Sequence, residues 1–317
     1  MDKYLGDDLR MSQTYSLEVN APGLSPAEQQ QAADIVAAMD AKSTRFYTPC
    51  GTGHMVWRRW GQGTPVVLFH GGGGAWTHWI RNIGPLSERY TVWAADTPGL
   101  GESDLPEPAS MDAICDIVQR GVEQLIPEGS IDVMGFSLGG PIATSLAAGL
   151  GPRLRHLILA ASRYVPGFKR VFPELVSWRT LEDPIERLAG HRRNLELMML
   201  AHPENIDALA VYIQSVNTPR GRIYGKRINP GSKLLECLRH ARPQGRVTGI
   251  CGRDDQAARE IMHQQEAGLH AVQPNGRFHI IDHAGHWIQY EAAGRFNELA
   301  LAALAEPVRQ PQAAQIP

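Results

Sequence analysis

The chain has 317 residues, of which 43% are hydrophobic and 20% are charged. These fractions are typical of a globular protein, so disorder over the bulk of the chain is excluded. The 31 basic and 33 acidic side chains give a net charge of −2, which excludes the strongly basic surface that nucleic acids or anionic membranes bind.

Four scattered cysteines, Cys50, Cys115, Cys237 and Cys251, form no Cys-x-x-Cys pair, and we interpret them as reduced thiols. The first residues contain no apolar core typical of a signal peptide. No apolar run approaches the roughly 18 residues that span a bilayer. The sequence therefore predicts a cytoplasmic protein with no nucleic-acid or membrane partner.

Residues 1–44 are expected to form an N-terminal extension with one helix. Ser25, Pro26 and Glu28 are typical of a helix start, as N-cap, first helical residue and closing residue of a capping box. Four apolar residues follow at helical spacing: Ala32, Ile35, Val36 and Met39. We expect this helix to pack on the main domain, and a contact between the two copies of a homodimer is the alternative.

From about residue 54, short apolar runs bounded by turn residues recur along the chain. Such runs are typical of strands buried on both faces of a parallel sheet. They lie at 66–69, 91–95, 131–134, 157–160, 247–251 and 278–281. Helical segments between them lie at 111–126, 140–150, 256–270 and 291–305. This alternation predicts an α/β fold with a mostly parallel, doubly wound sheet and right-handed crossovers.

The alternation stops between residues 163 and 243, where the pattern is helical or irregular. We expect helices at 186–200, 204–216 and 232–240. An insertion after the carboxyl end of a strand lies over the ligand crevice of an open α/β sheet. We therefore interpret 163–243 as a helical cap on a core formed by 45–162 and 244–317, and the alternative is that this segment only extends the core.

The strongest local signal is a G-x-S-x-G pentapeptide, Gly135-Phe136-Ser137-Leu138-Gly139. It follows a predicted strand and precedes a helix of small residues, as expected for a sharp turn that exposes a strained serine hydroxyl. Glycines flank the serine because side chains there would clash with the adjoining strand and helix. Ser137 is therefore the predicted nucleophile.

His70 and the four glycines after it also follow a predicted strand. Glycines let backbone amides approach an oxyanion without an intervening side chain. We predict that the amides of Leu138 and Gly72 form the oxyanion hole, with Gly72 chosen from 71–73. Phosphate binding is the alternative for a glycine run, but no Gly-Lys-Ser/Thr follows.

A serine hydroxyl needs a base, and three histidines around the last predicted strand compete for this role: His279, His283 and His286. His279 falls within the strand, whereas Gly285 gives the loop freedom to present His286, which is the predicted base. The spacing of His283 and His286 also suits a metal, but no acidic or cysteine cluster accompanies them in the sequence. We therefore predict neither a metal nor a cofactor.

An acid is needed to orient the imidazole, and Asp254 and Asp255 follow the strand at 247–251. Their position between nucleophile and base matches the order Ser…Asp…His. Spacing favours Asp255, and Asp254 is then a solvated charge of the loop.

These motifs resemble those of the α/β-hydrolase superfamily over about residues 54–305. The segment 96–104 is similar to the family's D-x-P-G-x-G-x-S motif, 252–255 to its acid loop, and 284–291 to its histidine loop. In that acid loop the acid lies three residues after the glycine, which implies Asp255. The resemblance implies an α/β-hydrolase fold with a serine triad.

Within the superfamily, His70–Gly74, Arg81–Ile83 and Gly285–Trp287 look most like the C–C bond hydrolases of aromatic meta-cleavage pathways. Those enzymes have asparagine before the nucleophile, where this chain has Phe136. They also have a cap arginine that binds the dienol substrate. The candidates here are Arg192, Arg193 and Arg220.

Phe136 makes the expected pocket more apolar, which suits an ester or thioester acyl group. We therefore predict a hydrolase that cleaves a small, largely apolar carboxylic ester or related acyl compound through an acyl-enzyme. The alternatives are a C–C hydrolase of the 2-hydroxy-6-oxo-dienoate type and a non-catalytic ligand sensor. Besides Gly71, the candidates for the pocket wall are aromatic: Trp76, Trp79, Phe136, Trp178, Tyr212 and Trp287.

Overall fold

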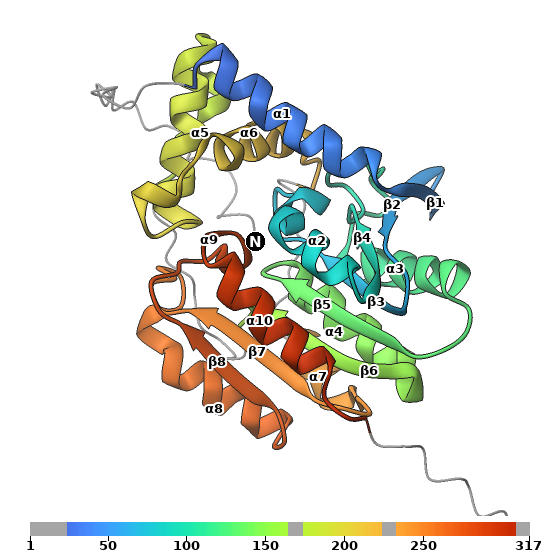
Figure 1. The fold of residues 1–317 in the computed structure, drawn as a ribbon. Coiled ribbons are helices and arrows are strands. Elements are labelled where there is room, and N and C mark those ends of the chain that lie inside the picture. Colours follow the sequence, from blue (N-terminus) through green and yellow to red (C-terminus); the bar gives the residue numbers. More distant parts are fainter. Residues whose placement is uncertain (1–23, 164–173, 224–232, 309–317) are drawn as a thin grey trace, which may run out of the picture.

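A single eight-stranded sheet organises the chain in the computed structural model, which describes residues 24–163, 174–223 and 233–308 (Figure 1). The strands are β1 (Thr44–Cys50), β2 (Gly53–Trp60), β3 (Thr64–Phe69), β4 (Tyr90–Ala95), β5 (Ile131–Phe136), β6 (Leu154–Ala160), β7 (Val247–Gly252) and β8 (Arg277–Ile281). Their order is β1-β2-β4-β3-β5-β6-β7-β8. The strands from β4 to β8 pair in parallel, whereas β2 pairs antiparallel with β1 and with β4. The predicted α/β fold with a mostly parallel sheet is confirmed.

Helices cover both faces of the sheet, so the central strands are buried on both sides. In β3, Val66 and Leu68 belong to one apolar cluster, and Val67 and Phe69 belong to another. The first cluster includes α2 (Ile80–Ser87), α9 (Ile288–Glu291) and α10 (Ala293–Leu304). The second includes α3 (Met111–Leu125), α4 (Gly139–Leu150), α7 (Lys233–His240) and α8 (Met262–Val272). Alternate side chains of one strand thus fill opposite faces, which explains the continuous apolar runs.

The sequence pattern missed both β1 and β2, and it merged some helices. In β1 only Thr48 and Cys50 are buried, because this strand lies at the edge of the sheet. An edge strand with one covered face carries too few apolar residues to form a run. The helix expected at 256–270 consists of η6 (Arg259–Ile261) and α8, and the one expected at 291–305 is divided between α9 and α10.

A mostly helical insertion joins β6 to β7. Its described elements are η3 (Trp178–Thr180), α5 (Pro184–Met198), η4 (Pro203–Asn205), α6 (Ala208–Asn217), η5 (Thr218–Arg220) and α7. In Figure 1, α5 and α6 lie together beyond the edge of the sheet, with α1 (Pro26–Ala41) along them, whereas α7 packs on α4. Helix α7 falls within the predicted cap of residues 163–243, but it packs over a face of the sheet with α4 and away from α5 and α6. Residues 164–173 and 224–232 of that segment lie outside the described residues.

Helix α1 begins as its sequence predicts. The Ser25 hydroxyl accepts a hydrogen bond from the Glu28 amide at 3.3 Å, and the Glu28 carboxylate accepts one from the Ser25 amide at 2.8 Å. However, α1 packs mainly on α6, and its link to the sheet is at its carboxyl end, where the Trp60 indole donates to the Met39 carbonyl at 2.9 Å. The expected packing on the main domain is therefore confined to that end.

None of the four cysteines forms a disulfide bond in the structure. Every described helix is too short or too polar to cross a lipid bilayer.

Candidate active site

The predicted serine turn is present between β5 and α4. Ser137 has a φ of +51°, in the left-handed region that a non-glycine residue occupies only under strain. Two hydrogen bonds hold it there: the Ser137 amide donates to the Ala160 carbonyl at 3.0 Å, and the Gly140 amide donates to the Ser137 carbonyl at 3.0 Å. Strain of this kind costs about 1–3 kcal/mol and persists where the surroundings enforce it.

The flanking glycines are required by close backbone approach. A Cβ on Gly135 would lie 2.5 Å from the carbonyl oxygen of Gly139, and a Cβ on Gly139 would lie 2.4 Å from that of Phe69. Because neither glycine has a side chain, α4 packs closely on β5 and β3, and Ser137 lies at the carboxyl edge of the sheet. The clash expected for side chains beside the serine is therefore confirmed.

Ser137, His286 and Asp255 form one hydrogen-bonded relay. The His286 Nε2 atom lies 2.9 Å from Ser137 Oγ, and its Nδ1 atom lies 2.8 Å from Asp255 Oδ2. The side chains of His286 and Asp255 are only 3% and 1% exposed. With the Nδ1–H donating to Asp255, a neutral His286 presents a free lone pair on Nε2 to the serine proton.

Asp255 is also held from its other side. Its Oδ1 atom accepts a hydrogen bond from the Ala257 amide at 2.9 Å. Arg163 lies close enough for their charges to interact: burial lowers the pKa of Arg163, and the carboxylate of Asp255 opposes that shift. Both neighbours favour an ionised carboxylate, which is the form that stabilises an imidazolium.

The competing residues lie elsewhere. Asp254 faces His202, with its Oδ2 atom 3.2 Å from His202 Nε2. His283 belongs to the same group as His202, and His279 lies within β8. The geometry therefore brings together the residues preferred from the sequence, Ser137, Asp255 and His286.

The glycine loop after β3 lies beside the nucleophile. A Cβ on Gly72 would lie 3.7 Å from Leu138 Cδ2, so the two predicted oxyanion donors are neighbours. Among the described residues, neither amide donates a hydrogen bond to another group. Gly71 must be glycine, since a Cβ there would lie 2.9 Å from the ring of Phe136.

Two buried histidines support this loop. His70 donates through Nδ1 to the Gly71 carbonyl at 2.8 Å and accepts from the Thr97 amide through Nε2 at 3.0 Å. His78 accepts from the Gly71 amide through Nδ1 at 3.3 Å. Burial lowers the pKa of both rings, and that of His78 falls well below its ordinary value. Both are therefore neutral at pH 7. His78 was missed in the sequence because its role depends on contacts made only in the fold.

A cavity of about 530 Å³ opens onto the relay, within the range of small-molecule sites. The predicted residues among its walls are Gly71, Gly72, Phe136, Ser137, Leu138, Trp178 and His286. The other lining residues come mainly from the insertion: Leu175, Val176, Ser177, Arg179, Asn194, Met198, Met199, Gln214 and Thr218. No periodic signal in the sequence distinguishes these from residues that pack within the insertion.

Four residues predicted for the pocket wall lie elsewhere. Trp76 and Tyr212 line a smaller cavity of about 140 Å³, where Trp76 packs on the ring of Trp60 at 5.4 Å. Trp287 is fully buried, stacks on Tyr290 at 4.2 Å and donates its indole N–H to the His78 carbonyl at 2.9 Å. It positions the loops around the site without lining the cavity. Trp79 is likewise buried in the apolar core.

Among the described residues, the arginine that lines the cavity is Arg179, which is not one of the three candidates from the sequence. Its guanidinium stacks over the ring of Trp178 at 4.2 Å. Arg192 donates to the Ile206 carbonyl, Arg193 pairs with Glu196, and Arg220 pairs with Glu102. Arg179 lies on the short η3 helix, outside the longer helical patterns that guided the prediction.

Comparison with known proteins establishes the family. A family model described as "alpha/beta hydrolase fold" matches residues 64–293, so the chain belongs to the α/β hydrolases. The chain is 29% identical over 266 residues to a 2-hydroxy-6-oxo-6-phenylhexa-2,4-dienoate hydrolase of Comamonas testosteroni, with 76% of this chain and 87% of that protein covered. It is 28% identical over 277 residues to a protein of the same name from Burkholderia cepacia, with 77% and 89% covered.

Solved structures share the fold. The meta-cleavage product hydrolase CumD of Pseudomonas fluorescens IP01 has a TM-score of 0.66 at 21% identity, with 81% of this chain and 96% of that chain covered. The naproxen esterase of Bacillus subtilis has a TM-score of 0.66 at 19% identity, with 89% and 99% covered. The chain is thus a hydrolase of a fold that carries both C–C hydrolases and esterases.

Proposed function

We propose that this protein is a serine hydrolase that cleaves a small, largely apolar carboxylic ester or related acyl compound through an acyl-enzyme. The observation that carries the proposal is the continuous relay from Ser137 through His286 to Asp255, at 2.9 Å and 2.8 Å. A nucleophile, a base within hydrogen-bond reach and an orienting acid are the requirements for activating a serine.

The proposed reaction has two halves. In the first, His286 Nε2 takes the hydroxyl proton as Ser137 Oγ attacks the carbonyl carbon, and the amides of Leu138 and Gly72 bind the oxyanion. His286 then gives the proton to the leaving group, and an acyl-enzyme remains. In the second half, water attacks the acyl carbon with His286 as base, and Ser137 regains its proton. Asp255 stabilises the imidazolium in both halves.

The cavity supports an apolar acyl group. Phe136, Trp178, Met198 and Met199 supply apolar surface around the nucleophile. Methionine adapts to irregular ligands, and aromatic rings provide large contact areas. The side chains of this chain, its backbone amides and water suffice for every step.

A second candidate is hydrolytic C–C cleavage of a dienoate. Two observations favour it: relatives bear the name 2-hydroxy-6-oxo-6-phenylhexa-2,4-dienoate hydrolase, and Arg179 lines the cavity. A guanidinium pairs well with a substrate carboxylate. His286 would first assist conversion of the dienol to the ketone. Ser137 Oγ would then attack the ring-bearing carbonyl as its proton passes to His286, and the adjoining C–C bond would break as His286 gives that proton to the departing carbon. Water would hydrolyse the remaining acyl-enzyme.

Replacing the nucleophile tests the proposal. Ser137→Ala should lower kcat on p-nitrophenyl esters by at least about 10³-fold, because no other group can form the acyl-enzyme. A fluorophosphonate probe should label the wild type and not this variant. Ser145→Ala, a half-buried serine of α4, is the matched control and should keep full activity. Turnover retained in Ser137→Ala, with an unchanged circular dichroism spectrum, would contradict the assignment.

Arg179→Met separates the two candidate substrates. Loss of a charged hydrogen bond to a carboxylate costs about 1.5–3 kcal/mol, so kcat/KM on a coloured dienoate should fall about 10- to 100-fold. Activity on a neutral ester should change far less. Arg192→Met is the control, since Arg192 donates to the Ile206 carbonyl outside the cavity. Strong activity on esters with none on the dienoate would exclude C–C cleavage as the function.

A further inference from the structure

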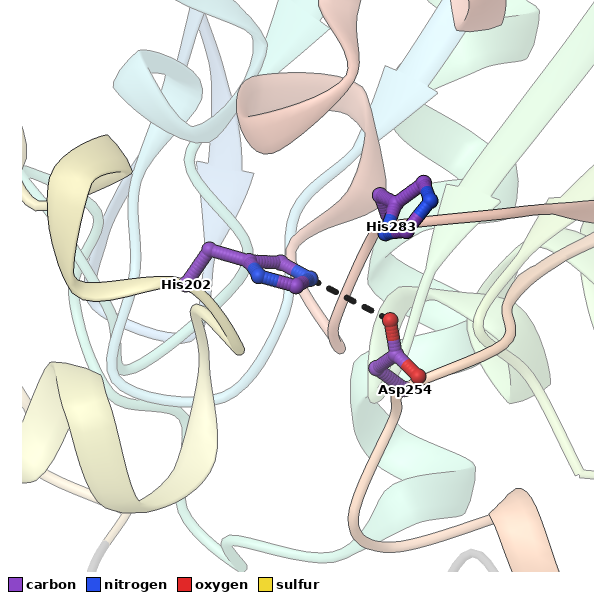
Figure 2. A group of neighbouring side chains, drawn as sticks. All are labelled: His202, Asp254 and His283. Atoms are coloured by element: carbon purple, nitrogen blue, oxygen red, sulfur yellow. Dashed lines mark hydrogen bonds and ion pairs between the residues drawn. The ribbon is translucent and has the colours of Figure 1, made fainter.

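Three potential metal ligands meet outside the serine site. His202 lies between α5 and η4, Asp254 follows β7, and His283 follows β8 (Figure 2). One ligand atom from each lies within 4.8 Å of the other two. The two partners of His283 come from other loops, 29 and 81 residues earlier in the chain, so the sequence around His283 contains no sign of them.

The backbones that carry these side chains are held independently of them. The Glu291 carboxylate accepts hydrogen bonds from the amides of His202 at 2.9 Å and Gly285 at 2.6 Å. The Asp254 amide donates to the Ala284 carbonyl at 2.9 Å. The three loops are therefore held together without the side chains of His202, Asp254 and His283, so an ion would meet a largely preformed set of ligands.

The donor atoms suit zinc. Zn²⁺ binds imidazole nitrogen and carboxylate oxygen at about 2.0–2.2 Å, so ligands of a tetrahedral site lie roughly 3.3 Å apart. His202 Nε2 and Asp254 Oδ2 are already 3.2 Å apart. The half-exposed position of the cluster leaves room for water as a fourth ligand.

One nitrogen of the His202 ring already points at a second ligand. Its Nε2 atom lies 3.2 Å from Asp254 Oδ2, so His202 presents Nε2 to the cluster. Its Nδ1 atom lies 3.9 Å from Glu204 Oε1, beyond hydrogen-bond distance, so the ring is not held from that side.

We propose that His202, Asp254 and His283 form a Zn²⁺ site that fastens the insertion to the two loops carrying Asp255 and His286. Both ring nitrogens of His286 are engaged with Asp255 and Ser137, so this site is separate from the serine relay. Bound zinc would resist movement of the chain that follows Met198 and Met199, which line the substrate cavity.

Calorimetric titration of ZnCl₂ into the full chain, without a polyhistidine tag and freed of metal by chelation, tests the site. One ion per chain is expected for the wild type. His202→Ala and His283→Ala should each abolish binding. His263→Ala removes an exposed histidine of α8 and should bind as the wild type does. Co²⁺ should give visible absorption bands that are lost in the same variants.

Thermal unfolding supplies a readout independent of activity. Saturating Zn²⁺ should raise the Tm of the wild type and of Ser137→Ala by a few degrees, and leave that of His283→Ala unchanged. His283 is exposed, so this variant retains the fold even if His202→Ala does not. Absence of binding to the wild type, binding that persists in both histidine variants, or binding that requires His286 would overturn the proposal.

Discussion

Asp254 and Asp255 are adjacent in the chain, yet their carboxylates serve different partners. Asp255 is buried and contacts His286, whereas Asp254 is 41% exposed and contacts His202. The two residues lie at a turn after β7, where the Asp255 amide donates to the Gly252 carbonyl at 3.3 Å, so their side chains point in different directions. Asp255 contacts the proposed catalytic base, and Asp254 faces the junction with the insertion.

Asp255→Asn should lower kcat by about 10⁴-fold, because an amide at this position favours the wrong tautomer of His286. Asp254→Asn, measured in the presence of a chelator, should cost far less. Steady-state kinetics on a p-nitrophenyl ester distinguish the two variants. A larger loss for Asp254→Asn than for Asp255→Asn would show that the acid has been misassigned.

At the scale of elements, the turn between β5 and α4 holds the proposed nucleophile in a strained conformation. The strained Ser137 is tolerated because Gly135 and Gly139 let the strand and the helix approach closely. The same approach places the start of α4 beside the glycine loop after β3. Two elements distant in the chain thereby contribute one amide each to the proposed oxyanion hole.

Gly135→Ala should destabilise the fold by about 1–3 kcal/mol, since its Cβ would lie 2.6 Å from the Cβ of Ala143 and even closer to the Gly139 carbonyl. Gly294→Ala is the matched control. It lies in α10 with nothing within 4 Å of the added methyl, and alanine there should stabilise by up to about 1 kcal/mol. Guanidinium unfolding measures both, and equal free energies of unfolding would contradict the steric argument.

At the scale of the whole molecule, a buried carboxyl group links stability to pH. Burial between β5 and β6 raises the pKa of Asp132 to about 7, although Arg155 and the His156 amide lower it. The unfolded chain releases this proton near pH 4. Between those values the folded state holds a proton that the unfolded state has lost, so this group makes stability fall as pH rises from about 4 to 7.

Asp132→Asn should remove that contribution while keeping an acceptor for the His156 amide. The free energy of unfolding of the variant, relative to that of the wild type, should therefore rise by on the order of 2 kcal/mol from pH 5 to pH 7. Urea unfolding of both proteins at both pH values measures this difference, and the contributions of the other titrating groups cancel because both proteins contain them. A difference independent of pH would mean that Asp132 is ionised throughout this range.

The sequence by itself determined the features that depend on neighbours in the chain. The capping box of α1, the apolar central strands, and the glycines around Ser137 follow from contacts within a few residues, and each is found in the structure. The order of the proposed nucleophile, acid and base could also be predicted, because each of these residues follows the carboxyl end of a strand. Steric rules of this kind act on a short segment whatever the rest of the chain does.

Only the tertiary structure decided which side chains surround the site. Trp287 and Trp178 are both aromatic, yet the first packs in the core and the second lines the cavity. Trp287 is fully buried and Trp178 is half-buried, but both are large apolar side chains that gain from leaving water, so residue type alone cannot distinguish them. Other features likewise depend on contacts made only in the fold: the positions of Arg179 and His78, and the grouping of His202 with Asp254. For Arg179 and His202, the packing of the insertion onto the sheet makes these contacts.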